Sequence, residues 1–199
     1  MRPRILFFLL SSVGTLGVYG FQSITARNRR RMLAAWTCND GVGLHPFSCL
    51  GITTSLLSRV KYEKPSAIQD RAIPVVMSGA DMIAEAPTGS GKTVAYALPI
   101  LETLLKQGGG NGRRRRPYAL VLVPTRELAQ QVGWAFETLL GFDQRGSSGD
   151  TVLVVHGGVG ARLQASALER GMVDILVATP GRLLDLTENA RETLLSDLR

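Results

Sequence analysis

Apolar residues along the body of the chain follow two alternating patterns, one typical of strands and one typical of helices. Runs of strand length that are continuously apolar, apart from Thr151 and Asp174 at the first positions of the last two, occur at 119–123, 151–155 and 174–178, and a half-apolar run lies at 81–85. A polar or glycine-containing turn follows each run and leads into a segment with helical spacing of apolar residues. Strands that alternate with helices predict an α/β fold with a parallel sheet, in which the continuous runs are buried on both faces.

Apolar positions spaced three and four residues apart predict the helices. The predicted helices are 47–60, a segment capped by Ser66, 94–107, a segment ending near Leu140, a segment through Gln164 and Leu168, and a segment beginning at Leu183. Functional groups in parallel sheets gather at the carboxyl ends of the strands. The turns that follow the predicted strands are therefore the candidate site.

The turn after the 81–85 run reads Ala86-Pro87-Thr88-Gly89-Ser90-Gly91-Lys92-Thr93, which predicts a phosphate-binding loop. Glycines let the backbone approach phosphate oxygens, and the following helix presents unpaired N–H groups to an anion. Lys92 adds positive charge, and the Thr93 hydroxyl suits Mg²⁺. The general pattern has glycine where this chain has Ala86, and the alternative is a glycine-rich turn that carries Lys-Thr by coincidence.

A second candidate lies upstream, at the start of the helix that Ser66 caps. Gln69 falls in the first turn of that helix, and its amide has the donor and acceptor needed to bind the edge of adenine. Tyr62 offers a ring face for stacking. On composition alone, an ordinary capped helix with a surface glutamine is the simpler interpretation.

The net charge of +7 does not by itself indicate a basic binding face. Residues 1–39 hold basic but no acidic side chains, and the run Arg113–Arg116 lies in a predicted loop. That run is either a solvated surface loop, which we favour, or a nucleic-acid contact. Cys38 and Cys49 have neither the spacing of metal ligands nor the number needed for a disulfide framework.

The N-terminal residues 1–43 have the order of a targeting leader. Arg2 and Arg4 precede an apolar run from Ile5, small residues follow, and the next stretch is rich in arginine. A signal peptide followed by a transit peptide resembles the leader of algae with complex plastids, in which Phe21 would follow the signal cleavage point. The sequence predicts plastid import, with mitochondrial import, a membrane anchor or a mis-started gene model as alternatives, and a leader that is not part of the fold.

In chain order, the motifs of residues 44–199 resemble those of the first RecA-like domain of DEAD-box ATP-dependent RNA helicases. The matching stretches are Phe47 with 62–69 (Q motif), 86–93 (motif I), the Pro-Thr-Arg-Glu-Leu-Ala run 124–129 (motif Ia), Gly157-Gly158 (glycine doublet) and the Thr-Pro-Gly-Arg run 179–182 (motif Ib). The resemblance implies a parallel-sheet P-loop domain of the RecA-like class.

The same resemblance implies ATP and Mg²⁺ as cofactors and RNA as the partner. The residues implied at the nucleotide are Tyr62, Lys64, Gln69, Thr88, Gly89, Ser90, Gly91, Lys92 and Thr93, with Lys92 and Thr93 catalytic and Thr93 on the metal. The residues implied at RNA are Pro124, Thr125, Arg126, Gly157, Gly158, Thr179, Gly181 and Arg182. The family's contacts go mainly to sugar and phosphate, which gives little sequence specificity. DNA stays open as a substrate, because backbone contacts discriminate through the 2′-OH.

No Asp-Glu-Ala-Asp sequence occurs in the 199 residues. The resemblance implies that this motif holds the metal, follows on the next strand, and precedes a second RecA-like domain. We therefore expect a domain truncated at its C-terminal end, with weak ATP binding, negligible hydrolysis and a long unpaired sheet edge. The alternatives to the front part of a helicase are a nucleotide- or RNA-binding module without turnover and a non-functional product.

Overall fold

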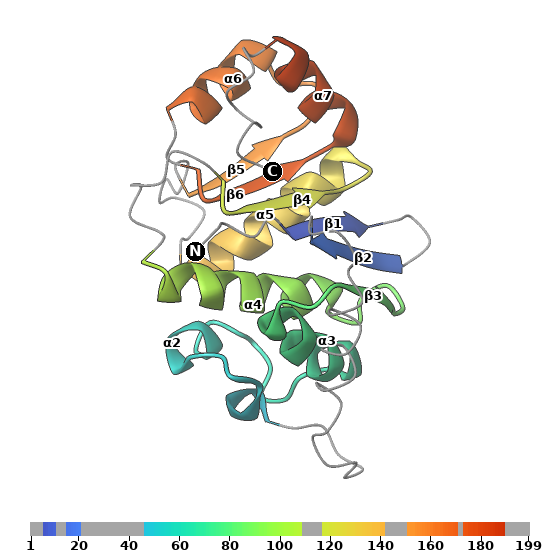
Figure 1. The fold of residues 1–199 in the computed structure, drawn as a ribbon, viewed down its shortest axis with the longest axis vertical. Helices are drawn as coiled ribbons and strands as arrows, with labels where there is room; N and C mark the ends of the chain where they lie inside the picture. Colours follow the sequence, from blue (N-terminus) through green and yellow to red (C-terminus); the bar gives the residue numbers. More distant parts are fainter. Residues whose placement is uncertain are drawn as a thin grey trace.

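The computed structural model describes residues 6–10, 15–20, 46–108, 117–141, 151–170 and 173–189. A six-stranded sheet lies at the centre, in the order β3-β2-β1-β4-β6-β5 (Figure 1). The strands are β1 (Leu6–Leu10), β2 (Thr15–Gly20), β3 (Met82–Glu85), β4 (Ala119–Leu122), β5 (Val152–Val155) and β6 (Ile175–Ala178). Parallel pairing joins β1 to β4, β4 to β6 and β6 to β5, whereas β2 pairs antiparallel with both β1 and β3. The predicted α/β fold with a parallel sheet is confirmed.

The helices are η1 (Phe47–Leu50), α2 (Thr54–Leu57), α3 (Ala67–Ser78), α4 (Lys92–Lys106), α5 (Arg126–Leu140), α6 (Ala161–Glu169) and α7 (Pro180–Asn189). The prediction of one helix over 47–60 is wrong, because Gly51 adopts a left-handed conformation (φ 75°) and separates η1 from α2. The last helix begins at Pro180 rather than Leu183. Proline fits the first helical position because its missing N–H would be unpaired there.

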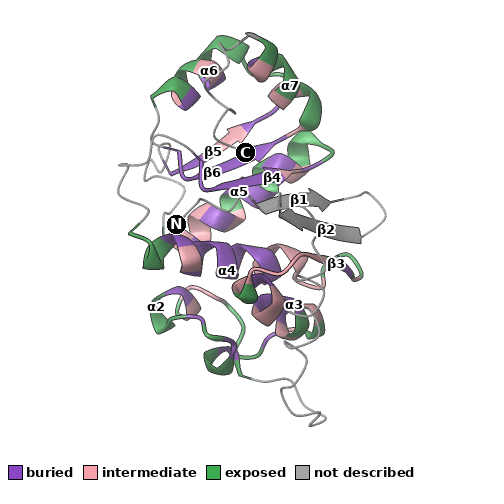
Figure 2. Ribbon diagram, in the orientation of Figure 1, coloured by how far each residue is buried: buried purple, intermediate pink, exposed green. Residues whose placement is uncertain are grey.

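The core has two parts, one on each face of the sheet. Alternate side chains of β4 separate them, since Ala119 and Val121 face α4 and α5 whereas Leu120 packs with α6 and α7. Figures 1 and 2 show the same division, with α3 and α4 on one side of the sheet and α6 and α7 on the other. Burial on both faces explains why β4 reads as a continuous apolar run.

The N-terminal strands correct one expectation. Residues 1–43 were expected to lie outside the fold, but β1 and β2 occupy the middle of the sheet between β3 and β4. The edges of β3 and β4 that face one another are therefore both paired. The physical reason is that the backbone N–H and C=O groups along an open sheet edge need hydrogen-bond partners. Any apolar stretch of strand length can supply them, whichever part of the chain it comes from.

Within the described ranges, no helix combines the length and the apolar character needed to span a membrane.

Glu102 on α4 is a buried carboxylate that fastens α2 to the core. Its Oε2 accepts hydrogen bonds from the backbone N–H of Thr53 (2.9 Å) and from the Thr53 hydroxyl (3.0 Å). Its Oε1 lies 3.0 Å from Nζ of Lys106. Burial raises the pKa of Glu102, but the bonds from Thr53 and the Lys106 ammonium outweigh burial, so the pKa is lowered below its ordinary value.

We expect Glu102→Gln to lower the free energy of unfolding at pH 7 by about 2 kcal/mol, because a buried charge-assisted contact is lost. A carboxyl group with a lowered folded-state pKa contributes stability above its unfolded pKa and loses that contribution as the pH falls through the folded pKa. The difference between the variant and the wild type should therefore shrink as the pH falls below 4.5, the ordinary pKa of this group. Urea unfolding over this pH range measures it, with exposed Glu169→Gln as the matched control. A difference independent of pH would contradict the assignment.

Candidate functional site

The loop between β3 and α4 has the backbone conformation of an anion-binding turn. Gly91 is the N-terminal cap of α4 with φ 89°, and Gly89 has φ 80°, a region that L side chains rarely adopt. Pro87, Thr88 and Gly89 are exposed. The N-terminus of α4 therefore opens to solvent beneath a loop that an anion can reach.

Gln69 supports this loop from below. Its side chain is only 3% exposed, which rules out the interpretation of a surface glutamine. Oε1 accepts from the Ser66 N–H (2.9 Å), and Nε2 donates to the carbonyl of Gly91 (3.2 Å). The Ser66 hydroxyl donates to the carbonyl of Ser90 (2.7 Å). The start of α3 and the loop between β3 and α4 are thus joined as one unit. One Nε2 hydrogen is left over from the bond to Gly91.

The other residues predicted at the nucleotide lie around the same loop. Nζ of Lys92 donates to the carbonyls of Ala86 and Pro87. An incoming phosphate would have to replace these carbonyls as the acceptor. Tyr62 is 68% exposed, so its ring is open for stacking, and Lys64 is also exposed.

Thr93 lies in the first turn of α4 and is half-buried. The hydroxyl of Tyr96, one turn further along the helix, lies beside the Thr93 side chain. Burial raises the pKa of Tyr96 well above its ordinary value, and the contact with Thr93 lowers it by a smaller amount. Tyr96 therefore stays neutral and adds no charge beside Thr93. Among the described residues, no three His, Cys, Asp or Glu side chains are grouped closely enough to hold a metal ion.

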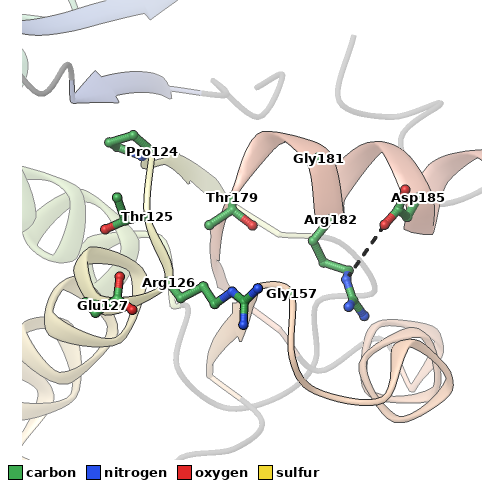
Figure 3. A pocket seen from close by; sticks show the side chains of 9 residues that line it. All are labelled: Pro124, Thr125, Arg126, Glu127, Gly157, Thr179, Gly181, Arg182 and Asp185. Carbon is green, nitrogen blue, oxygen red and sulfur yellow. Dashed lines mark ion pairs between the residues drawn. The ribbon is translucent and has the colours of Figure 1, made fainter.

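A hollow of about 510 Å³ lies at the carboxyl ends of β4, β5 and β6 (Figure 3). The residues that line it are Pro124, Thr125, Arg126, Glu127, Gly157, Thr179, Gly181, Arg182 and Asp185. Seven of the residues predicted at RNA are thus brought together, and Gly158 follows directly in the chain. The turns are linked by backbone bonds from Val123 N–H to Ala178 O (2.9 Å) and from Thr179 N–H to Val155 O (3.0 Å).

Arg126 lies over the glycine doublet. A Cβ at Gly158 would come within 2.7 Å of Nη1 of Arg126, and Gly158 itself has φ 92°. Figure 3 shows the Arg126 side chain extending from the start of α5 toward Gly157. The absence of a side chain at Gly158 therefore leaves room for Arg126, a reason for this glycine that the sequence did not reveal.

Arg182, in contrast, is anchored within the protein. Its side chain is 13% exposed, and Nε lies 3.9 Å from a carboxylate oxygen of Asp185. Its Nη1 donates to the carbonyl of Val159 (2.9 Å) and to Oε1 of Gln164 (3.3 Å). The sequence analysis placed Arg126 and Arg182 at RNA alike, but in the structure the Arg126 side chain is exposed whereas that of Arg182 is held by hydrogen bonds.

Of the two acidic residues of the hollow, Glu127 lies in the predicted motif Ia run without an assigned contact, and Asp185 was not predicted. Glu127 and Asp185 line it together with the two arginines, so its charged side chains balance. Attraction for an anion must then come largely from positioned N–H groups at the starts of α5 and α7. The sequence could have indicated Asp185, because it follows Arg182 by one helical turn and therefore lies beside it on the same face of the helix.

A sequence model of the DEAD/DEAH box helicase family matches residues 66–199. The chain is 40% identical over 166 residues to DEAD-box ATP-dependent RNA helicase 52A of Oryza sativa subsp. japonica, a match that covers 74% of this chain and 26% of that relative. The chain thus spans about a quarter of the length of this curated relative.

Two solved structures are also similar to this chain. The crystal structure of the yeast DEAD-box splicing factor Prp28 matches with a TM-score of 0.62 at 27% identity, over 86% of this chain and 42% of that one. The RNA helicase Prp28 of Chaetomium thermophilum, solved bound to ADP, matches with a TM-score of 0.52 at 37% identity, over 70% of this chain and 33% of that one.

Two glycine substitutions separate backbone strain from packing in the loop. Gly89 and Gly91 both have positive φ, so alanine at either costs about 1–2 kcal/mol of folding free energy. A Cβ at Gly91 would also meet the buried amide of Gln69, whereas one at Gly89 meets nothing. We expect Gly91→Ala to lower the urea midpoint clearly more than Gly89→Ala. Equal losses would show that Gln69 does not pack against the loop.

Proposed function

The chain belongs to the DEAD/DEAH box helicase family, and on that premise we propose that it carries the ATP-binding loop and an RNA-contacting surface of an ATP-dependent RNA helicase. One observation supports this most strongly. The loop after β3 and the hollow after β4, β5 and β6 lie at the carboxyl ends of strands that run in the same direction. In open α/β sheets, ligands bind at this edge.

For the nucleotide, we propose that the spare Nε2 hydrogen of Gln69 and the exposed ring of Tyr62 hold adenine. Gly89, Gly91 and the N-terminus of α4 receive the phosphates, and Lys92 transfers its hydrogen bonds from the loop carbonyls to phosphate oxygens. The Thr93 hydroxyl would hold Mg²⁺, which neutralises charge on the β- and γ-phosphates when bound. The fit rests on the positive-φ glycines and on the half-buried hydroxyl at the first turn of α4.

For RNA, we propose that the backbone of a single strand lies in the hollow. Arg126 supplies charge from one side, and the starts of α5 and α7 supply N–H groups. The contacts go to sugar and phosphate, so sequence preference is low.

We further propose that residues 1–43 direct the chain to an organelle, a plastid in the first instance and a mitochondrion as the alternative. Only the order of charged, apolar and small residues supports this. A fusion of residues 1–43 to a fluorescent protein, expressed in an alga with complex plastids, should be imported into the plastid. Diffuse cytosolic fluorescence would refute import.

Replacing Lys92 tests the nucleotide proposal. We expect Lys92→Ala to weaken binding of a fluorescent ATP analogue by about tenfold or more, because one charge-assisted phosphate contact is lost. Fluorescence titration of the full chain measures it. Lys106→Ala, at the far end of α4, is the control and should bind as the wild type does. Equal binding by the Lys92 variant would refute the assignment.

Replacing Arg126 tests the RNA proposal. We expect Arg126→Gln to weaken binding of labelled ten-nucleotide RNAs of different sequence to a similar extent, about fivefold, and to lower the salt slope by about one. Fluorescence anisotropy at several salt concentrations measures both. Exposed Arg71→Gln on α3 carries the same charge change outside the hollow and should bind like the wild type. A sequence-dependent loss would argue for base contacts instead.

A further inference from the structure

A buried glutamine on α6 connects two of the stretches that border the hollow. Gln164 is 5% exposed, although glutamine is usually a surface residue. Its Nε2 donates to the carbonyl of His156 (3.3 Å), the residue directly after β5, and its Oε1 accepts from Nη1 of Arg182 on α7 (3.3 Å). A single amide thus uses a donor and an acceptor on two different elements.

The loop of residues 157–160 is held by the same group of contacts. Its carbonyl at Val159 accepts from the same Nη1 of Arg182 (2.9 Å). Gln164 fixes the start of this loop at His156, and Arg182 fixes its later part. Gly157 and Gly158, the positions predicted at RNA, lie between these two anchors.

His156 extends the connection to α5. Its Nδ1 lies 2.8 Å from the carbonyl of Gly157, and a carbonyl can only accept, so Nδ1 carries the proton. Nε2 is then the acceptor, and it lies 3.3 Å from Nε2 of Gln130 on α5. Gln130 belongs to the helix that begins at Arg126. Hydrogen bonds thus run from α5 through the loop and α6 to α7.

We propose that Gln164 is a positioning residue for RNA binding, which holds Arg182 and the Gly157-Gly158 loop in the geometry that receives the RNA backbone. The inference rests on the proposed function of the hollow. Gln164 does not line the hollow and acts through its neighbours. A half-buried arginine that is held by the Val159 carbonyl, the Gln164 amide and the Asp185 carboxylate keeps its direction, whereas an untethered arginine loses that direction to rotamer freedom.

The test compares Gln164→Met with the full wild-type chain. Methionine keeps the length and volume but removes both hydrogen bonds. In the free protein, we expect amide hydrogen exchange over residues 157–160 to rise about tenfold. With labelled U10 RNA, we expect an about fivefold higher Kd and a salt slope lower by about one, as if a phosphate contact were lost. Exposed Gln131→Met on α5 is the matched control.

Two further variants distinguish positioning from general destabilisation. Gln164→Glu keeps an acceptor for Arg182, so it should keep the wild-type salt slope. In an Arg182→Gln background, Gln164→Met should raise the Kd by less than it does in the wild type, because one of the two groups that it positions is already changed. Additive losses, or an unchanged salt slope in Gln164→Met, would overturn the inference.

The exchange measurement separates this inference from the proposed function. If the wild-type chain does not bind U10, the RNA proposal fails, and the exchange result still decides whether Gln164 holds the loop. Unchanged exchange over residues 157–160 would overturn the positioning role whatever the RNA result. If Gln164→Met does not fold, the same measurements on Gln164→Glu decide, with faster exchange at the loop and an unchanged salt slope expected.

Discussion

Backbone hydrogen bonding along both edges of β4 is the constraint on which the structure depends. β6 pairs with one edge and β1 with the other, so the strand after the first long loop joins the two halves of the sheet. An unpaired edge here would expose N–H and C=O groups in the middle of the core. The core on each face, and the alignment of the strand ends that form the hollow, both depend on this pairing.

The leader is where a local pattern and the fold disagree. A short apolar run followed by small residues is typical of a signal peptide, and the same composition suits two strands of a hairpin. The order of residues cannot decide between a signal peptide and a hairpin. A hairpin forms only if the fold leaves an unpaired sheet edge close to this stretch in space. A chain without residues 1–43 would lack β1 and β2, the two strands that join β3 to β4 in this sheet.

Strand and helix positions in the body were predictable because their apolar periods are long and uninterrupted. The break at Gly51 was not predictable. A single glycine within a helical pattern can continue the helix or end it, and the packing of the rest of the chain decides which. The residues around the hollow could be grouped from their place after parallel strands. The contacts of Gln164 and His156 could not, because a buried polar residue on an amphipathic helix has the same spacing as a core residue.

The balance of charge in the hollow bears on how it recognises a ligand. Two arginines and two carboxylates line the hollow and give it little net charge, so a polyanion gains affinity mainly where donors are already directed at its oxygens. Holding a hydrogen-bond donor in one direction on a surface loop costs free energy, because the side chain loses rotamer freedom. The hydrogen bonds through Gln130, His156 and Gln164 impose that order within the protein itself. None of these three side chains lines the hollow itself, so they act by holding the loop and the arginine that border it.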